Sequence, residues 1–303
     1  MDFTLDQDQQ GIVDAVTTIL TRHAGTERAR AVGAAGHDDT LLSTLADAGF
    51  LDLAADPAIG PLGAVLVAEL ASRHHARANV AIRALVGPML LGDETPARLA
   101  VMDASRPGPV RFGQHADVAL ILDGDEAHLA RITDATPIDS PYGYPFAHIE
   151  TSRTRSLGPG SGATLANWWR VALAAEISGA LDGAIAHTVA YLRDRQQFKK
   201  PLGSLQALQH RLAEAYVTAE GARWLARRAA FEGAPAESAA AAAAYAAQAA
   251  QLIGTDMHQL SGAIGFTIEF DLQLWTSRLH ALRVEFGGVT AHQLATTRAQ
   301  WPS

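Results

Sequence analysis

The chain has 303 residues, of which 48% are hydrophobic and only 6% aromatic, and its formal net charge is −8. This length is long for one core and fits one large or two to three small subdomains, built mainly from aliphatic side chains. The acidic balance argues against general nucleic-acid binding, because nothing supplies a basic stripe for a phosphate backbone. The sequence contains no cysteine, which excludes disulfides and thiolate chemistry and fits a reducing compartment.

The N-terminal segment predicts no signal peptide. Residues 1–7 lack the basic region and the apolar core that such a peptide needs. The apolar run at residues 85–92 is too short to span a bilayer. We therefore expect a soluble, cytoplasmic protein without a membrane span.

Helical patterns dominate the first third of the chain. Thr4 and Gln7 have the spacing of a capping box, and apolar residues follow on one helical face. Thr40 begins a second helix. Two more helices are predicted at residues 64–75 and 79–91. These patterns predict an all-helical N-terminal subdomain over residues 1–104.

The middle of the chain has a different character, because Pro and Gly become frequent and short β-type runs appear. The predicted strands lie at residues 110–112, 118–122, 128–132 and 147–151. These runs predict a reduced β-rich middle subdomain over residues 105–162.

Helices return in the last part of the chain. The longest are predicted at residues 165–197, 204–232 and 236–254, and two shorter ones follow. Residues 238–250 are nearly all Ala, which favours close helix–helix packing by small side chains. We expect a mainly α fold in which residues 163–303 form a C-terminal four-helix bundle.

The segment at residues 195–214 combines cations and amides around a helix break. Arg193 and Arg195 precede the break at Pro201, and Gln206 and Gln209 follow it. Guanidinium groups bind phosphate oxygens in a planar, bidentate geometry. The segment therefore predicts a binding site for a phosphate-bearing ligand.

Several segments, in the right order, resemble the acyl-CoA dehydrogenase family. The strongest is residues 195–210, which resembles its R-x-x-F…Q-x-x-x-H signature. Four further segments resemble its N-terminal helix, its L-x-x-x-G-L/F-x-x-L segment, its first bundle helix and its Q-x-x-G-G-x-G-[FY]-x-x-E segment: residues 1–10, 45–53, 169–180 and 259–270. The order of helices, β insert and helical bundle also matches. The resemblance implies an acyl-CoA dehydrogenase-like fold over most of the chain.

What the family implies is flavin chemistry on an acyl-CoA thioester. A carboxylate removes the α-proton while the β-hydrogen leaves as hydride to FAD, and a trans-2-enoyl-CoA forms. The electron acceptor, by analogy, is an electron-transfer flavoprotein.

The resemblance also implies which residues of this chain contact FAD across a subunit interface. These cofactor-binding residues are Arg195, Gln197, Phe198, Gln206, Gln259, Ser261 and Gly262. Arg195 offers a permanently charged fork for a diphosphate, and Phe198 offers a face for adenine. The alternative is that Arg195 pairs with a nearby acid and that Phe198 packs in the core.

The chain departs from the family at the flavin ring and at the catalytic base. The T-E-P-x-x-G-S-D and W-I-[TS]-[NG] runs, which wrap the flavin, have no counterpart. Where the family has Y-E-G-T, the chain has Glu285 followed by Phe286, which falls on the glutamate position. Glu285 lies one or two places away, where a local shift would bring it into register, so it is the candidate catalytic base; the alternative is a solvated or salt-bridged Glu285, with Arg283 close by. His292 is a weaker substitute.

The histidines give no sign of a metal site. His74, His75 and His210 lack the spacing of ligands with carboxylate partners, so we expect no bound metal.

Three functions fit these patterns. The first is a short subunit of an actinobacterial heteromeric acyl-CoA dehydrogenase. It contributes FAD contacts to a full-length catalytic partner in an α2β2 heterotetramer. Bulky or steroid-derived acyl-CoAs fit such an assembly as substrates. The second is a self-sufficient homo-oligomeric dehydrogenase with Glu285 as base. The third is a flavin-free structural partner protein.

Overall fold

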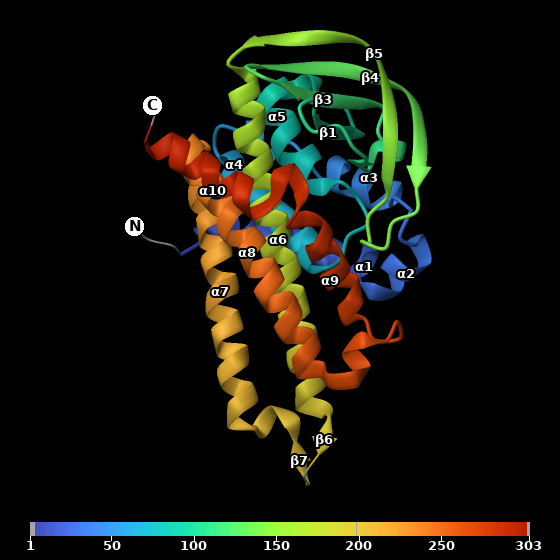
Figure 1. The fold of residues 1–303 in the computed structure, drawn as a ribbon, viewed down its shortest axis with the longest axis vertical. Helices are drawn as coiled ribbons and strands as arrows, with labels where there is room; N and C mark the ends of the chain where they lie inside the picture. The colour runs from blue at the N-terminus through green and yellow to red at the C-terminus, as the bar shows by residue number, and fades with distance from the viewer. Residues whose placement is uncertain (1–3, 198, 302–303) are drawn as a thin grey trace.

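Three long, nearly parallel helices form the axis of the molecule (Figure 1). The computed structural model describes residues 4–197 and 199–301. The long helices are α6 (Ser161–Asp194), α7 (Gln206–Phe231) and α8 (Ala236–Ser261). A five-stranded sheet lies at one end of this bundle and a two-stranded hairpin at the other, and we call these the sheet end and the hairpin end. The mainly helical fold predicted from the sequence is confirmed.

The first third of the chain is helical, as predicted. Its helices are α1 (Gln7–His23), α2 (Thr26–Val32), α3 (Asp39–Asp47), α4 (Gly60–Arg73) and α5 (Gly87–Leu91), the last preceded by a π-turn at Ile82–Val86. The predicted position of the first capping box is wrong by two residues. Asp6 accepts from the N–H of Gln9, and Gln9 accepts from the N–H of Asp6, so this pair satisfies the free N–H groups of the first turn.

The sheet is mixed, with the strand order β1-β3-β4-β5-β2. Its strands are β1 (Leu99–Asp103), β2 (Val110–Arg111), β3 (Val118–Asp123), β4 (Glu126–Ile138) and β5 (Phe146–Pro159). β1 pairs parallel with β3, and the other pairs are antiparallel. The four predicted strands are found, whereas β1 was not predicted. A short apolar run does not distinguish a strand from a buried helix. The division at residue 105 stays a prediction.

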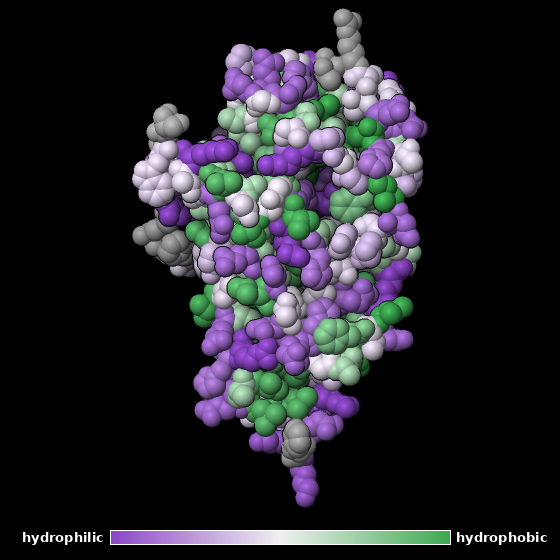
Figure 2. Space-filling view, in the orientation of Figure 1, coloured by the Kyte–Doolittle hydropathy of each residue, from purple (hydrophilic) through white to green (hydrophobic). Residues whose placement is uncertain are grey.

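The segment between α6 and α7 is a small hairpin and not a simple helix break. α6 ends at Asp194, three residues before the predicted end, and β6 (Gln196–Gln197) then pairs with β7 (Lys200–Pro201). The hairpin projects beyond the bundle (Figure 1). Apolar side chains gather on the surface beside it, shown green near the lower end of Figure 2.

The bundle packs through small side chains. α6 is buried over most of its length and lies between α4 and α8. At Gly179 of α6, an added Cβ would lie 2.0 Å from the backbone oxygen of Glu69 in α4. Most of the buried residues of α8 are Ala, as its sequence predicted. The last two helices, α9 (Leu272–Leu282) and α10 (Gly288–Gln300), return the chain to the sheet end.

Within the described residues, no helix is both long and apolar enough to cross a membrane.

We predict that Gly179→Ala destabilises the protein while Gly254→Ala does not. The Gly179 substitution pushes a methyl group into the backbone of α4, which costs about 1–3 kcal/mol of unfolding free energy. Gly254, in α8, has no atom within 4 Å of an added Cβ, so the better helix propensity of Ala stabilises by up to about 1 kcal/mol. Chemical denaturation of both variants measures the difference. Equal free energies of unfolding would contradict this description of the α4–α6 contact.

Candidate functional site

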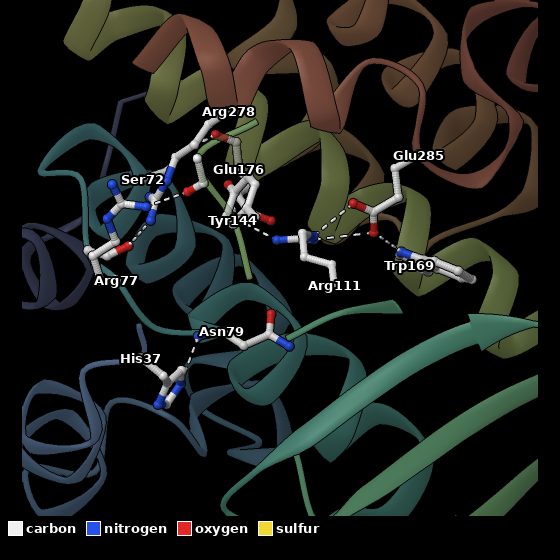
Figure 3. A network of polar contacts seen from close by, with 12 residues as sticks. His37, Ser72, Arg77, Asn79, Arg111, Tyr144, Trp169, Glu176, Arg278 and Glu285 are labelled. Atoms are coloured by element: carbon white, nitrogen blue, oxygen red, sulfur yellow. Dashed lines mark hydrogen bonds and ion pairs between the residues drawn. The ribbon is translucent and has the colours of Figure 1, made fainter. Parts of the chain in front are cut away.

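A buried arginine joins the sheet to the bundle at the sheet end (Figure 3). Arg111 of β2 donates to Glu176 of α6 at 2.8 Å. It also donates to both carboxylate oxygens of Glu285, at 2.8 and 3.3 Å. The Arg111 side chain is only 6% exposed. Burial opposes its charge, but the two carboxylates outweigh burial and raise the pKa of Arg111 above its usual value.

Tyr144 and Arg278 extend this network behind Glu176. The Tyr144 hydroxyl donates to Glu176 at 2.7 Å, and burial together with that carboxylate raises the pKa of Tyr144 above its usual value. Arg278 of α9 lies 4.6 Å from the Tyr144 ring centroid and donates to the Ala76 carbonyl at 2.8 Å. We call Arg111, Tyr144, Trp169, Glu176, Arg278 and Glu285 the Arg111 network.

The turn before α10 presents Glu285 to this network. Phe286 has a φ of 54°, an uncommon conformation for a residue with a side chain, and Gly287 and Gly288 follow with φ of 90° and 67°. The Phe286 ring stacks on Trp169 of α6 at 4.4 Å, which holds the strained turn. The Trp169 indole N–H donates to Glu285 at 2.9 Å.

A pocket of about 530 Å³ opens beside Glu285. Its walls come from residues 101–111, residues 138–146, Trp169 and residues 281–287. Most of these side chains are apolar. Its charged residues are Asp103, Arg106, Arg111, Asp139 and Glu285, which together have one more negative than positive charge.

Glu285 is the residue that the sequence indicated as a base. Its predicted alternative partner, Arg283, instead donates to Gln251 at 3.2 Å, and the ion pair forms with Arg111. Both Glu285 oxygens accept hydrogen bonds from Arg111 or Trp169. A base must also lie within hydrogen-bond reach of the proton that it removes, which these contacts do not establish. The role of Glu285 therefore stays a prediction.

The predicted cofactor residues lie at the hairpin end, away from Glu285 (Figure 1). Arg195 and Gln197 are exposed at the start of the hairpin, and Gln206 is exposed at the first turn of α7. Asp194, the nearest acid in sequence, pairs with Arg193. No ion pair among the described residues involves Arg195. Phe198 lies outside the described residues.

The remaining predicted cofactor residues lie where α8 ends, also at the hairpin end. Gln259 is exposed. Ser261 is buried, and its hydroxyl donates to the Met257 carbonyl at 2.8 Å. Gly262, with a φ of 68°, ends the helix. The fold thus brings Arg195, Gln197, Gln206 and Gln259 to one end of the bundle, and it leaves them apart from Glu285. We call these four residues the hairpin-end cluster.

Sequence reasoning missed most of the Arg111 network. One indication was available, because Glu176 interrupts an apolar helical run and a buried carboxylate requires a partner. Arg111, between two apolar residues of a predicted strand, was a second indication. Their pairing spans 65 residues of sequence, so local patterns do not connect them.

His292 of α10 lies behind Phe286. Its side chain is fully buried, and its ring centroid is 6.1 Å from that of Phe286. Burial, reinforced by the charge of Arg170, lowers the pKa of His292 to about 4. The imidazole is therefore neutral near pH 7.

Comparisons with known proteins identify the fold class and the family to which the chain belongs. Residues 162–300 match the model of the acyl-CoA dehydrogenase C-terminal domain. The chain is similar in fold to a chain of the ChsE4–ChsE5 complex from Mycobacterium tuberculosis, with a TM-score of 0.85 at 21% identity and full coverage of both chains. It is also similar to the Tcur3481–Tcur3483 steroid acyl-CoA dehydrogenase, with a TM-score of 0.82 at 23% identity and 98% coverage of both. These two likenesses show the acyl-CoA dehydrogenase fold.

A sequence relative shows the family itself. The chain is 30% identical to the acyl-CoA dehydrogenase IpdE2 of Mycobacterium tuberculosis (strain ATCC 25618 / H37Rv), over 91% of this chain and 92% of that protein. The chain therefore belongs to the acyl-CoA dehydrogenase family, whose members are oxidoreductases that act on CH–CH bonds. The resemblance recognised in the sequence is confirmed.

We predict that His292 makes the protein less stable in acid. Its pKa is about 4 when folded and about 6.5 when unfolded, so between these values the unfolded chain binds more protons. The free energy of unfolding should fall by up to about 1.4 kcal/mol per pH unit as pH decreases from 6.5 to 4.

The variant His292→Leu should lose this part of the pH dependence. At pH 8 His292 is neutral in both the folded and the unfolded protein. The difference in unfolding free energy between the variant and the unmodified protein at this pH therefore measures the effect of the substitution on packing alone. His75 is also buried with a depressed pKa, so part of the slope remains in the variant. A slope equal to that of the unmodified protein would reject the assignment.

Proposed function

We propose that this chain is a subunit of a FAD-dependent acyl-CoA dehydrogenase, and that its hairpin-end cluster contacts the FAD of a partner subunit. The observation that supports this is the exposure of Arg195 together with three amide side chains on one end of the bundle. An arginine without an ion-pair partner among the described residues, at the same end of the bundle as surface amides and exposed apolar side chains, suits a surface that another subunit covers.

The donor set of the hairpin-end cluster fits a diphosphate. The Arg195 guanidinium supplies charge, and the amides of Gln197, Gln206 and Gln259 supply uncharged donors. The pocket at the sheet end does not fit the same group, because its two arginines pair with carboxylates and its net charge is negative. We therefore assign the contacts to the cofactor's diphosphate and adenosine part to the hairpin end.

FAD, when bound, accepts the β-hydrogen of the acyl-CoA as a hydride. The residues of this chain would hold and orient the cofactor and exclude water from its buried face. The α-proton would pass to a carboxylate of the partner, because in this chain Phe286 falls on the family's glutamate position and the Glu285 carboxylate is held in an ion pair with Arg111.

The relatives support a heteromeric assembly. One solved structure with this fold is the ChsE4–ChsE5 complex, and another, a steroid acyl-CoA dehydrogenase, pairs Tcur3481 with Tcur3483. We propose for this chain a full-length dehydrogenase partner in an α2β2 heterotetramer, a bulky, steroid-type acyl-CoA substrate, an electron-transfer flavoprotein as acceptor, and a cytoplasmic location.

A self-sufficient homo-oligomeric enzyme is the second candidate. One observation favours it, because Glu285 lines the pocket at the sheet end. Flavin content separates the candidates. The chain purified alone should be colourless and the co-expressed pair yellow. Yellow, active protein from this chain alone would favour the second candidate, and a pair without flavin would favour a structural role.

We predict that Arg195→Ala in the co-expressed pair lowers FAD retention. Loss of a charged contact to a buried phosphate costs about 1.5–3 kcal/mol, so the FAD dissociation constant should rise at least tenfold. Arg193→Ala is the matched control, since Arg193 is a neighbouring exposed arginine that pairs with Asp194. Flavin absorbance after gel filtration measures retention. Equal retention in both variants would reject the role of Arg195.

We also predict that Glu285→Gln leaves most activity of the pair intact, because the partner supplies the base. The amide keeps the shape of the side chain but removes the charge that pairs with Arg111. The free energy of unfolding should fall by about 1–3 kcal/mol. Turnover and stability are measured on the same preparation. A loss of turnover by a thousandfold at unchanged FAD content would identify Glu285 as the base.

A further inference from the structure

A small cavity lies inside the protein beside two members of the Arg111 network. Its volume is about 10 Å³. The polar side chains on its wall are those of Ser72 in α4, Glu176 in α6 and Arg278 in α9, and the rest of the wall is alanine and Val80. Every lining residue is at most 6% exposed. The cavity therefore belongs to the interior and is separate from the pocket beside Glu285.

Both charged side chains on this wall have a polar atom without a hydrogen-bond partner among the described residues. Glu176 accepts from Arg111 and from Tyr144 through Oε1, whereas its Oε2 has no donor. Arg278 donates to the Ala76 carbonyl through Nη2, whereas its Nε has no acceptor. A buried charged group is costly while part of its hydrogen-bonding capacity is unfilled. These two atoms therefore require a partner that accepts from Nε and donates to Oε2.

Ser72 adds a third polar atom to the cavity. Its hydroxyl donates to the backbone carbonyl of Glu176 at 2.6 Å. A hydroxyl oxygen has two lone pairs, so Ser72 Oγ can still accept a hydrogen bond. The wall thus presents one donor and two acceptors, which is a set that a single water molecule can satisfy.

The charges and the size of the cavity exclude other occupants. An anion beside Glu176, or a cation beside Arg278, would meet a like charge at close range in an environment of low dielectric constant. Water has no net charge and both donates and accepts. A cavity needs about 10–15 Å³ to hold one water, so this cavity has room for one molecule and none for an organic ligand.

We propose that this cavity is the binding site of one long-lived water molecule, which accepts from Arg278 Nε and donates to Glu176 Oε2 and Ser72 Oγ. The three side chains converge in Figure 3 and come from three different helices. The water therefore joins α4, α6 and α9 at the Arg111 network. The proposal does not depend on the flavin contacts at the hairpin end.

A crystal structure of the full chain, at a resolution that shows ordered water, tests the site directly. We expect a single density peak within hydrogen-bond distance of Glu176 Oε2 and Arg278 Nε. After a soak in sodium bromide, this peak should show no anomalous signal. A map without the peak, or a bromide signal at its position, would overturn the proposal.

Relaxation dispersion of the water oxygen-17 nucleus counts long-lived buried waters in solution. Ala81 lines the cavity, whereas Ala246 of α8 is equally a buried alanine but lies outside it. Ala81→Val should remove one long-lived water from the count, because the added carbons occupy the cavity, and Ala246→Val should leave the count unchanged. Equal counts in the two variants would contradict the proposal. The crystal structure requires no substitution and decides the question even where a variant does not fold.

A pair of serine variants tests the third hydrogen bond. Ser72→Ala removes an acceptor from the cavity, so the residence time of the water should shorten several-fold. Ser178→Ala is the matched control, because Ser178 is a buried serine of α6 that bonds the Ala175 carbonyl and does not line the cavity. The same dispersion profiles give the residence times. Equal residence times in the two variants would overturn the assignment of Ser72 as a partner of the water.

Discussion

The ion pairs of Arg111 are the constraint on which the sheet end depends. One guanidinium from a two-residue strand contacts carboxylates from the longest helix and from the turn before the last helix. The buried guanidinium is held between the buried carboxylate of Glu176 and the partly buried carboxylate of Glu285, so loss of either carboxylate leaves it with a single counter-charge and weakens the contact between sheet and bundle. The relative position of sheet and bundle is therefore set by charge as well as by apolar packing. The ion pairs of Arg111 therefore also determine the shape of the pocket beside Glu285.

The two ends of the bundle differ in chemistry. At the sheet end the charged side chains of the Arg111 network are largely buried and paired within the chain. At the hairpin end Arg195 and its neighbouring amides are exposed. This contrast is the physical basis for assigning the cofactor contacts to the hairpin end.

Local features were predictable from the sequence, and long-range pairings were not. The helices follow their apolar periodicity, and Pro and Gly marked the change to strands. β1 was missed because Leu99–Asp103 has no alternating pattern, and the hairpin after Asp194 was missed because its pairs involve only four residues. The sequence pattern placed Gln206 after the break that follows Arg195, and family resemblance added Gln259, whose helix ends at the same end of the bundle. The contact of Glu285 with Arg111 joins residues 174 positions apart, and no sequence period encodes it.

The alanine-rich packing of the bundle makes its stability respond differently to smaller and to larger side chains. Buried alanines of α8 have only a methyl group to lose, worth about 0.8 kcal/mol of burial, so truncation leaves no large cavity. Enlargement is different, because the helices approach one another closely enough for added atoms to meet backbone, as at Gly179. Sequence variation in this bundle should consequently be limited from above by side-chain volume and from below by the helix propensity that Gly lacks. Alanine meets both limits, which accounts for its abundance in α8.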